Sequence, residues 1–576
     1  MSNKRNLPRS EYPRPQLVRK NWICLNGEWD FEIDNALNGT DKNFIDRSVL
    51  NSKITVPFCP ESILSGIGNT DFMSCVWYRR SLTVPVDWKN SDSRVIFHVG
   101  AADYHSIVFV NGKYIGEHKG GYTPFSFDIT DSLRFDESDY VTICVNDDVR
   151  GGNQPCGKQS QLPGSHGCYY TRTTGIWQTV WLEKVATKHI KNIKTKTDPE
   201  SCSVIFNILM SNNTAGSTIN ASVFYEGKKV GEASAVVSSF SADIYIKLTE
   251  KHLWEAGNGR LYDVVFEVVS EGKMTDTVES YFGLRSVALK DGAFLLNGKS
   301  VFGRWVLDQG FYPDGIYTAP TDEALKNDII NSQLLGFNGA RLHEKVFEPR
   351  FLYWADRLGY MVWGEHANWS LDISEFGQIE HFLPEWIEAI DRDFSHPSII
   401  GWCPFNETWD YNQKRQNDML LRTVYRITKQ LDPTRPVIDT SGNYHVETDI
   451  FDIHDYNQNK EQFASHYNKK LFFNFEERQT YNGEPYFVSE YGGIKWTIDI
   501  TEGWGYGDSP QSEEEFLDRY RSLTETLLAN EKVFGFCYTQ LYDVEQELNG
   551  LMTYDRRFKF PPEIIKEINI KKAAIE

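Results

Sequence analysis

A change in the hydrophobic pattern of the sequence at Gly283 is the strongest constraint on the fold. Beyond this residue, short apolar runs of strand type alternate with longer segments of helical period. Parallel strands that are covered by helices read as nearly continuous apolar runs. The repeated order of strand, loop and helix therefore predicts a (β/α)8 TIM barrel, in which catalytic groups lie at the C-terminal ends of the strands.

The elements of this barrel can be assigned along the chain from the apolar runs and the helical periodicity. The predicted strands are Val301–Asp308, Phe337–Leu342, Tyr360–Glu365, Ile399–Asn406, Val437–Thr440, Ile450–His454, Pro485–Ser489 and Val533–Tyr538. The predicted helices are Asp322–Leu335, Pro349–Leu358, Glu385–Phe394, Tyr411–Gln430 and Ser512–Asn530.

The chain before Gly283 carries only strand patterns. Between Leu25 and Glu183, short alternating runs such as Trp29–Ile33 and Val95–Val99 are separated by turn residues. Ser106–Val110 leads directly into Asn111-Gly112, which is a strong hairpin signal. This pattern predicts a β-sandwich.

A second and shorter strand-only unit follows from Val185 to Gly283. Its clearest strands are Ser203–Ile208 and Leu261–Val268. The length of the unit suits an immunoglobulin-like sandwich. We therefore expect three domains, with boundaries at residues 1–184, 185–284 and 285–576, in a fold that combines β and α/β architecture.

Composition narrows the range of partners. With 60 basic and 80 acidic residues the net charge is −20, which disfavours nucleic acid and anionic membranes. The nine cysteines lack C-x-x-C spacing, so neither a disulfide framework nor a zinc site is expected. No apolar stretch follows the basic start Met1–Ser10, and no run is long enough to span a bilayer. These features predict a cytoplasmic protein.

Two glutamates stand near the ends of apolar runs in the predicted barrel. Glu407 follows Ile399–Asn406, and Glu490 follows Pro485–Ser489. Each should be an ionisable group beside an apolar wall, where carboxyl pKa values are pushed apart. Two carboxylates about 5–5.5 Å apart can cleave a glycosidic bond with retention. The pair predicts a glycoside hydrolase.

Motifs along nearly the whole chain resemble glycoside hydrolase family 2, which includes β-galactosidases, β-glucuronidases and β-mannosidases. The resemblance implies a jelly-roll sandwich, an immunoglobulin-like sandwich and a catalytic barrel, and its members are often homo-oligomers. The matching segments are Leu25–Phe31, Val110–Gly112, Gly121–Phe125, Gly175–Leu182, Leu296–Lys299, Gly336–Arg341 and Asp356–Tyr360.

The resemblance also implies roles for individual residues. Glu407 after Asn406 matches the acid/base of the family, and Glu490 in Glu-Tyr-Gly matches its nucleophile. Asn406 should bind the sugar 2-hydroxyl, and Tyr456 should hold the nucleophile. Arg341 resembles the active-site arginine, although a purely structural ion-pair role remains open.

Other candidates are less constrained by the pattern. His454 and His396 are interpreted as hydrogen-bonded structural histidines, and His454 is kept as a candidate substrate contact. Trp504, in a glycine-rich loop beyond the nucleophile, is a further candidate substrate contact. For Trp369 and Tyr538, a sugar platform and core packing both remain open.

The specificity motifs of well-known members are incomplete. Their R-x-x-H motif is altered, because His343 comes one place early and Glu344 stands at the expected histidine. The aspartate that members of the family often carry before the last sandwich strand is replaced here by Tyr169. The N-x-K-G motif by which glucuronidases bind the sugar carboxylate is replaced by Glu547–Gly550, and Glu547 should repel a uronate. Ordinary glucuronidase activity is thus not expected.

Two kinds of side chain could take over substrate recognition. Lys345 is a candidate substitute cation, with a solvated surface lysine as the alternative. Asp308 and Glu344 are candidates for binding sugar hydroxyls, because carboxylates accept several hydrogen bonds.

We expect a retaining exo-β-glycosidase that binds an oligosaccharide or glycoside, with a β-galactoside as first choice. The alternatives are an unusual uronidase (β-galacturonidase or β-glucuronidase), an α-L-arabinopyranosidase, a transglycosidase, and an inactive carbohydrate-binding protein. No residue cluster has the spacing of metal ligands. Retaining hydrolysis needs no cofactor and no metal, so none is predicted.

Overall fold

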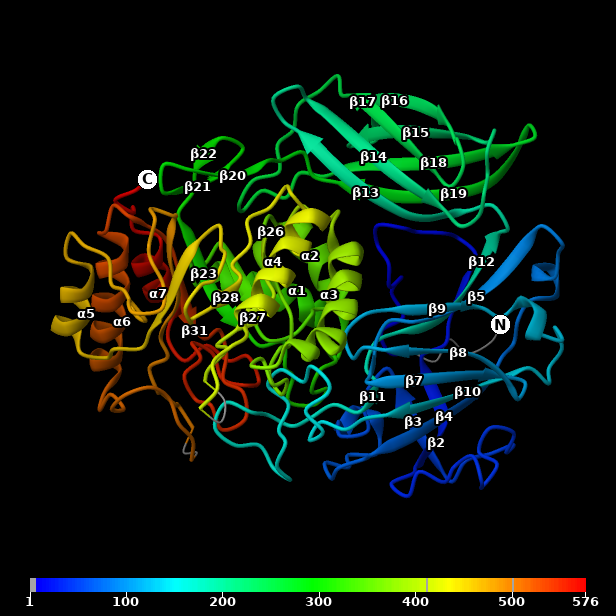
Figure 1. Ribbon diagram of the computed structural model, residues 1–576, viewed down its shortest axis with the longest axis horizontal. Helices are drawn as coiled ribbons and strands as arrows, with labels where there is room; N and C mark the ends of the chain where they lie inside the picture. The colour runs from blue at the N-terminus through cyan, green and yellow to red at the C-terminus, as the bar shows by residue number, and fades with distance from the viewer. Residues whose placement is uncertain (1–6, 411–412, 500–501) are drawn as a thin grey trace.

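The computed structural model describes residues 7–410, 413–499 and 502–576. Figure 1 shows two β-sandwiches at one side of a larger body in which helices surround parallel strands. The expected fold class is confirmed: two β-sandwich domains precede a C-terminal TIM barrel. None of the helices in the described ranges is both long enough and apolar enough to cross a membrane.

The N-terminal sandwich contains two larger antiparallel sheets and the short antiparallel pair β11-β6 in the described part of the chain. One has the order β1-β12-β5-β9, and the other has the order β3-β2-β4-β10-β7-β8. The expected turn at Asn111-Gly112 joins β7 to β8, and both residues have positive φ. The strands are β1 (Trp22–Cys24), β2 (Gly27–Ile33), β3 (Ser52–Val56), β4 (Cys75–Ser81), β5 (Ser93–Val99), β6 (Ala102–Asp103), β7 (His105–Val110), β8 (Lys113–Lys119), β9 (Phe125–Asp128), β10 (Tyr140–Asn146), β11 (Gly175–Ile176) and β12 (Val180–Ala186).

The second sandwich pairs a sheet of order β13-β14-β17 with a sheet of order β16-β15-β18-β19. Alternate residues of β18 are buried, which is the period expected for a strand with one face on a core. The strands are β13 (Ile190–Asp198), β14 (Ser203–Met210), β15 (Thr218–Tyr225), β16 (Lys228–Val236), β17 (Ser241–Lys247), β18 (Tyr262–Ser270) and β19 (Lys273–Phe282). Three short strands then lead into the barrel: β20 (Val287–Lys290), β21 (Ala293–Leu296) and β22 (Lys299–Ser300).

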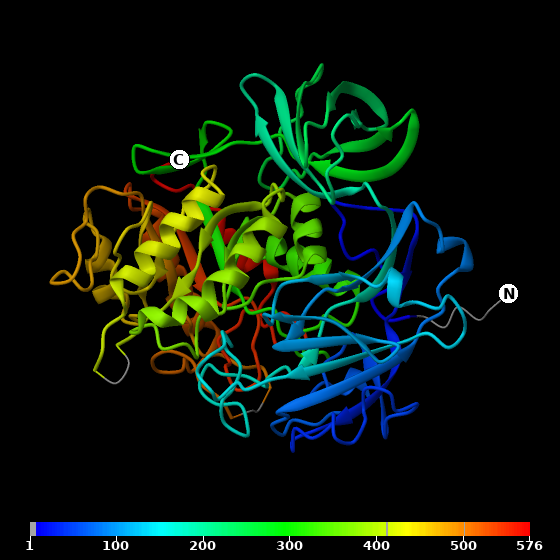
Figure 2. The same cartoon turned by 45° about the vertical axis from the view of Figure 1, so that its right-hand side comes forward.

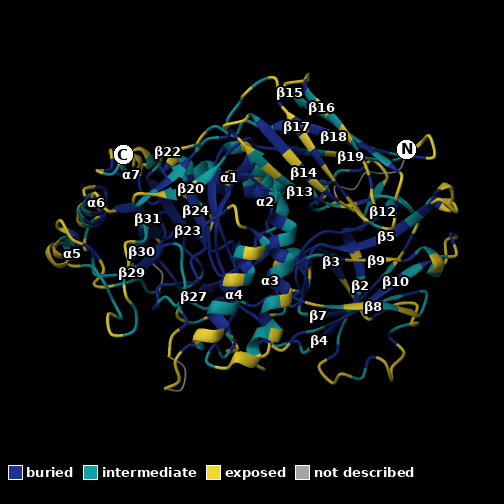
Figure 3. Ribbon diagram, turned by 45° about the horizontal axis from the view of Figure 1, so that its top comes forward, coloured by how far each residue is buried: buried dark blue, intermediate teal, exposed yellow. Residues whose placement is uncertain are grey.

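The barrel strands form a parallel sheet of order β26-β25-β24-β23-β31-β30-β29, with β27 and β28 paired beside it. Nearly all of their residues are buried, and Figure 3 shows these strands as the buried centre of the molecule. The strands are β23 (Gly303–Asp308), β24 (Gly339–Leu342), β25 (Met361–Glu365), β26 (Ile399–Cys403), β27 (Phe405–Asn406), β28 (Thr440–Ser441), β29 (Phe451–Asp455), β30 (Tyr486–Gly492) and β31 (Val533–Thr539).

Local signals explain where the barrel helices begin and end. Thr321 caps the first helix through the Ala324 N–H, and Gly359 ends the second with a φ of 66°. The helices are α1 (Asp322–Leu334), α2 (Pro349–Leu358), α3 (Ile379–Asp393), α4 (Asp418–Leu431), α5 (Lys460–Tyr467), α6 (Glu513–Leu528) and α7 (Pro562–Asn569).

Several predicted elements differ from the structure, among them Ile399–Asn406, which is divided into β26 and β27. Helix α3 begins six residues before the predicted Glu385 and continues through Pro384, which lies inside the helix. Helix α4 begins at Asp418, where Asn417 supplies the cap, whereas the predicted start Tyr411 lies outside the described residues. The predicted strand Val437–Thr440 is reduced to one bridge at Val437 and the two residues of β28.

A long segment of the first sandwich reaches the barrel. Residues 147–174, between β10 and β11, leave the sandwich and lie against the barrel loops, where Figures 1 and 2 show them in cyan. The Cys156 N–H donates to the Trp369 carbonyl (3.0 Å). The Tyr170 hydroxyl donates to Glu547 beyond β31 (2.5 Å). The N-terminal domain therefore contributes to the active-site face of the barrel.

Candidate active site

Glu490 lies in β30 and is buried at the C-terminal end of the barrel. Its Oε1 accepts a hydrogen bond from Arg341 Nη1 (3.1 Å). Its Oε2 accepts one from the Tyr456 hydroxyl. Because a donor from β24 and a donor that follows β29 hold the two oxygens, the carboxylate is fixed in one orientation.

Glu407 follows β27 directly and takes a left-handed backbone conformation, with a φ of 44°. Its N–H donates to the Ser441 carbonyl at the end of β28 (2.8 Å). Such a φ is unfavourable for a residue other than glycine, and it is found where the surroundings impose it. The turn places the Glu407 carboxylate at the mouth of the barrel, where it remains partly exposed.

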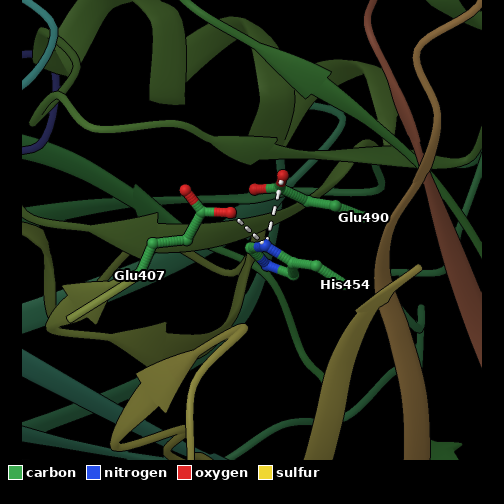
Figure 4. A group of neighbouring side chains, drawn as sticks. All are labelled: Glu407, His454 and Glu490. Atoms are coloured by element: carbon green, nitrogen blue, oxygen red, sulfur yellow. Dashed lines mark hydrogen bonds and ion pairs between the residues drawn. The ribbon is translucent and has the colours of Figure 1, made fainter. Parts of the chain in front are cut away.

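His454 of β29 lies between the two glutamates, as Figure 4 shows. Its Nδ1 is 2.7 Å from Glu407 Oε1 and 3.4 Å from Glu490 Oε2. Burial lowers the pKa of His454, but the two carboxylates outweigh it and raise that pKa above its ordinary value. Burial likewise opposes ionisation of Glu407, yet the bond from His454 keeps the pKa of Glu407 below its ordinary value. The histidine thus holds a proton between the carboxylates.

These three side chains also have a geometry that could hold a metal ion. Each offers a ligand atom, and the three atoms lie within 4.8 Å of one another. The raised pKa of His454 favours a ring that donates toward both carboxylates, and such a donor accounts for the close approach of the three side chains. The same measurement brings an oxygen of Glu407 within 4.8 Å of one of Glu490.

Arg341 of β24 organises the floor of the site. It donates to Glu365 (2.6 Å), to Glu490 (3.1 Å) and to the Asn406 side-chain oxygen (3.1 Å). Its exposed fraction is 1%, and the buried charge is compensated by the two carboxylates. His343 Nδ1 contacts the other oxygen of Glu365 (3.0 Å). Arg341 is thus both a structural ion-pair partner and a direct contact of Glu490.

Asn406 is oriented by its neighbours and keeps one free group. Its backbone is held by Asn368 and by the Trp369 indole, and its side-chain oxygen is held by Arg341. Its side-chain NH2 is buried, and no partner for it is found in the described residues. A buried donor without a partner is available to a ligand hydroxyl.

Tyr456 positions the second glutamate. Its ring stacks on Tyr506, with a centroid distance of 3.6 Å and an interplanar angle of 6°. Its hydroxyl also contacts Thr539 (3.0 Å). Burial and the nearby Glu490 charge raise the pKa of Tyr456 well above its ordinary value, so the hydroxyl remains a donor.

The structure places the remaining candidates at different points around the site. The Asp308 carboxylate bonds to Tyr542 and to the Gly310 N–H (3.0 Å), and burial raises its pKa to about 6. Glu344 is buried with Oε1 unpartnered among the described residues, and burial raises its pKa well above the ordinary value. Trp504 donates its indole N–H to the Gly167 carbonyl (2.5 Å) and so joins two loops.

Neither expectation for Lys345 is correct. Its side chain is buried, and its ammonium donates to the carbonyls of Gly310 (2.5 Å) and Tyr317 (2.9 Å). It also lies over the rings of Trp177, Tyr317 and Phe347. Burial lowers the pKa of Lys345 to about 7. The lysine holds a loop against the sandwich domain and is neither solvated nor available to substrate.

Sequence reasoning missed the contribution of residues 156–170. Lys158 and Tyr170 approach the barrel loops, and Tyr169 packs against Trp369 (5.2 Å between ring centroids). Their segment has no periodicity, so the pattern that located the glutamates could not place them. Its length and its clustered aromatic residues were the available signal.

Two other candidates have structural surroundings. His396, which was interpreted as a structural histidine, contacts Asp356 through Nδ1 (2.6 Å). Tyr538 is fully buried in the core.

Comparison with known proteins identifies the family. Sequence models of glycosyl hydrolases family 2 match residues 67–162 (sugar binding domain), 188–285 and 287–560 (TIM barrel domain). A β-glucuronidase of Streptococcus agalactiae is 23% identical, and the match covers 95% of both chains. A β-galactosidase of Thermoanaerobacterium thermosulfurigenes is 28% identical over 70% of this chain, which spans only 56% of that relative.

Solved structures share the whole architecture. The β-D-glucuronidase of Dictyoglomus thermophilum superposes with a TM-score of 0.78 and 21% identity, covering 97% of this chain and 98% of that one. A β-glucuronidase of Ruminococcus gnavus superposes with a TM-score of 0.81 and 17% identity, covering 96% and 99%. At these identities the structures show a common fold. Together with the matched domains, they establish that the chain belongs to glycosyl hydrolases family 2, a family of retaining glycoside hydrolases.

Proposed function

We propose that this enzyme is an exo-acting β-glucuronidase that uses Glu490 as nucleophile and Glu407 as acid/base. The observation that carries the mechanism is the approach of the two carboxylates to within 4.8 Å, with His454 between them. This separation suits double displacement better than the wider spacing of inverting enzymes, about 6.5–9.5 Å.

In the first step, Glu490 attacks the anomeric carbon and the glycosidic bond breaks. The Arg341 and Tyr456 donors keep a Glu490 lone pair aimed at the substrate. Glu407 delivers a proton to the departing oxygen, and the proton held by His454 Nδ1 is one hydrogen bond away from it. In the second step, Glu407 takes a proton from water, which attacks the glycosyl-enzyme and releases the sugar.

The glycone is proposed from the extent of the similarities. The relatives that match over nearly their full length are named β-glucuronidases, whereas the β-galactosidase matches over a little more than half of its own length. These similarities favour a uronide over the β-galactoside expected from the sequence. Glu547–Gly550 stands where glucuronidases carry the N-x-K-G motif and has no lysine. The uronate must therefore be bound by a group other than that lysine.

A substrate panel tests this proposal. Release of p-nitrophenol is measured from the β-glucuronide, β-galacturonide, β-galactoside, β-glucoside, β-mannoside and α-L-arabinopyranoside. The glucuronide should give the highest kcat/KM, and Glu490→Gln should lower it by about 10⁴-fold or more.

Each other result has a definite meaning. Preference for the galactoside would overturn the proposed glycone and leave the two glutamates in their roles. Undiminished turnover by Glu490→Gln would overturn the assignment of the nucleophile. Binding of a sugar without any turnover would favour the inactive carbohydrate-binding protein.

A further inference from the structure

Lys158 is held firmly against the active-site face of the barrel. Its carbonyl accepts a hydrogen bond from the Tyr170 N–H (2.7 Å), and the neighbouring Cys156 is bonded to Trp369. Gly157, with a φ of 55°, lies so close to Glu344 that a Cβ atom there would be 2.2 Å from its carbonyl oxygen. Only glycine allows this close packing, so the loop fixes the position of Lys158.

Lys158 is a largely buried lysine whose ammonium has no direct anionic partner in the described part of the chain. The residue is 6% exposed. Its Nζ lies 5.6 Å from the Trp369 ring centroid and 5.7 Å from that of Tyr170. Within the described ranges of the chain, it forms no side-chain hydrogen bond and no ion pair. A charge on a largely buried side chain without a protein partner is poorly compensated, so an anion supplied by a ligand would complete the arrangement.

The two aromatic neighbours place this cation between two parts of the site. The Trp369 indole N–H donates to the Asn406 carbonyl (3.1 Å), next to Glu407. The Tyr170 hydroxyl donates to Glu547, in the segment after β31. Lys158 therefore lies at the wall that joins the acid/base to Glu547.

Other cations near the catalytic pair are already bonded. Arg341 is shared between Glu365, Glu490 and Asn406, and His454 lies between the two catalytic glutamates. Burial lowers the pKa of Lys158, but nearby acidic groups, with Glu547 first, outweigh it and raise that pKa. Lys158 is consequently charged at neutral pH.

Glu547 does not use Lys158 as a direct partner. One oxygen of Glu547 accepts from the Tyr170 hydroxyl, and the other accepts from the Asn549 side chain (3.0 Å). The carboxylate is thus satisfied by neutral donors, and the Lys158 ammonium keeps its capacity to donate.

We propose that Lys158 determines specificity by binding the carboxylate of a uronic acid glycone, so that the sandwich domain supplies the cation that the barrel lacks. This inference rests on the proposed function. A carboxylate entering between Trp369 and Tyr170 would meet a preorganised ammonium with aromatic walls, whereas the hydroxymethyl group of a neutral hexose would leave the charge unpaired.

The test compares two substrates that differ only at the sugar C6 position. Values of kcat/KM are measured for p-nitrophenyl β-D-glucuronide and β-D-glucoside with wild type, Lys158→Met, Lys158→Arg and the control Lys113→Met. Lys113 is an exposed lysine at the start of β8. Lys158→Met should lower the glucuronide-to-glucoside ratio by about 10- to 100-fold, the range for one charge-assisted hydrogen bond. Lys158→Arg should restore part of the ratio, and Lys113→Met should leave it as in wild type.

A binding measurement separates this role from effects on chemistry. In the Glu490→Ala background, calorimetry with D-glucuronate and with D-glucose should show that Lys158→Met weakens binding of D-glucuronate selectively, with an unchanged melting temperature. An equal loss on both substrates would show that Lys158 only balances the charge of Glu547, and would overturn the inference.

The two proposals fail in different ways. If wild type prefers the glucuronide and Lys158→Met keeps that preference, the role of Lys158 is wrong and the proposed function stands. If wild type cleaves neither the glucuronide nor the galacturonide but cleaves a neutral glycoside, the proposed glycone and the role of Lys158 both fail.

Discussion

The two ends of the barrel interior are built from opposite chemistry on the same strands. In β25, Trp363 precedes Glu365 by two residues, and in β30, Phe487 precedes Glu490 by three. At one end, Trp363 stacks on Phe487 (5.9 Å between centroids), and Trp305 meets both rings edge-on. At the other end, the carboxylates are bonded to Arg341, His343 and Tyr456.

This contrast separates stability from activity along one strand. The rings bury large apolar surfaces, and they need neighbours of complementary shape but no hydrogen-bond or ionic partners. The charged end must satisfy each buried group with a partner, and it leaves a few donors open for the substrate. Changes at the aromatic end should therefore lower stability with little effect on catalysis, and changes at the charged end should do the reverse.

The largest expected effect is that of Glu407→Gln, which removes the proposed proton donor from the charged end. With a poor leaving group such as methyl β-D-glucuronide, kcat/KM should fall by up to about 10⁴-fold, the upper range for general acid catalysis. With an activated aryl glucuronide the loss in the bond-breaking step should be much smaller, because that leaving group needs little protonation. Equal losses on both substrates, measured in the pre-steady state, would contradict the role of acid.

The next largest effect is at the aromatic end. Trp305→Ala should lower the free energy of unfolding of the barrel by about 3–5 kcal/mol, because a fully buried ring leaves a cavity. Urea midpoints measure the change, and the exposed Phe240 provides a control, since Phe240→Ala should alter stability by less than about 0.5 kcal/mol. Below the transition, Trp305→Ala should keep the KM of wild type; a large rise in KM would break the proposed separation.

The difference between the two ends also explains what the sequence could predict. Strands buried on both faces read as apolar runs, so their order and the positions of Glu407 and Glu490 were accessible. Helices α5 and α7 were missed, although Asn459 as a cap and Pro562 in the first turn mark their starts. Both are short, and eight residues show little more than two periods.

The environment of the lysines could not be predicted in the same way. Lys345 and Lys158 are both buried in the structure, yet only the carbonyls around Lys345 satisfy its ammonium. The sequence next to each lysine indicates neither its burial nor the partners of its ammonium group, because the surrounding groups come from distant segments. Tertiary contacts alone decide whether a lysine is structural or available to a ligand.

His445 links the charged end to stability and gives a pH-dependent prediction. Its ring contacts Asp439 (2.7 Å) and Asp452, and Asp452 accepts from Ser441 behind the catalytic pair (2.6 Å). Burial lowers the pKa of His445, but these aspartates outweigh it and raise that pKa from 6.5 to about 9. The protonated ring therefore stabilises the folded state.

The sign of the effect follows from proton linkage. The raised pKa means that the stabilisation, about 3 kcal/mol, is complete below pH 6.5, declines between pH 6.5 and about 9, and is absent above that. Urea unfolding of wild type and His445→Gln should show a difference that shrinks across this window. A difference that is constant with pH would show that the ring is not charged.

The smallest effect is expected for Tyr456→Phe, which removes one donor from Glu490 and keeps the ring stacked on Tyr506. Loss of one hydrogen bond to a charged group should lower kcat/KM by about 10- to 100-fold. Tyr520→Phe is the matched control, because it removes a buried hydroxyl bonded to Asn569 in α7 (2.8 Å), away from the charged end. Both variants should lose similar stability, but only Tyr456→Phe should lose activity. If Tyr520→Phe lost as much activity, stability and catalysis would not be separable in this barrel, and the contrast between its two ends would be one of composition alone.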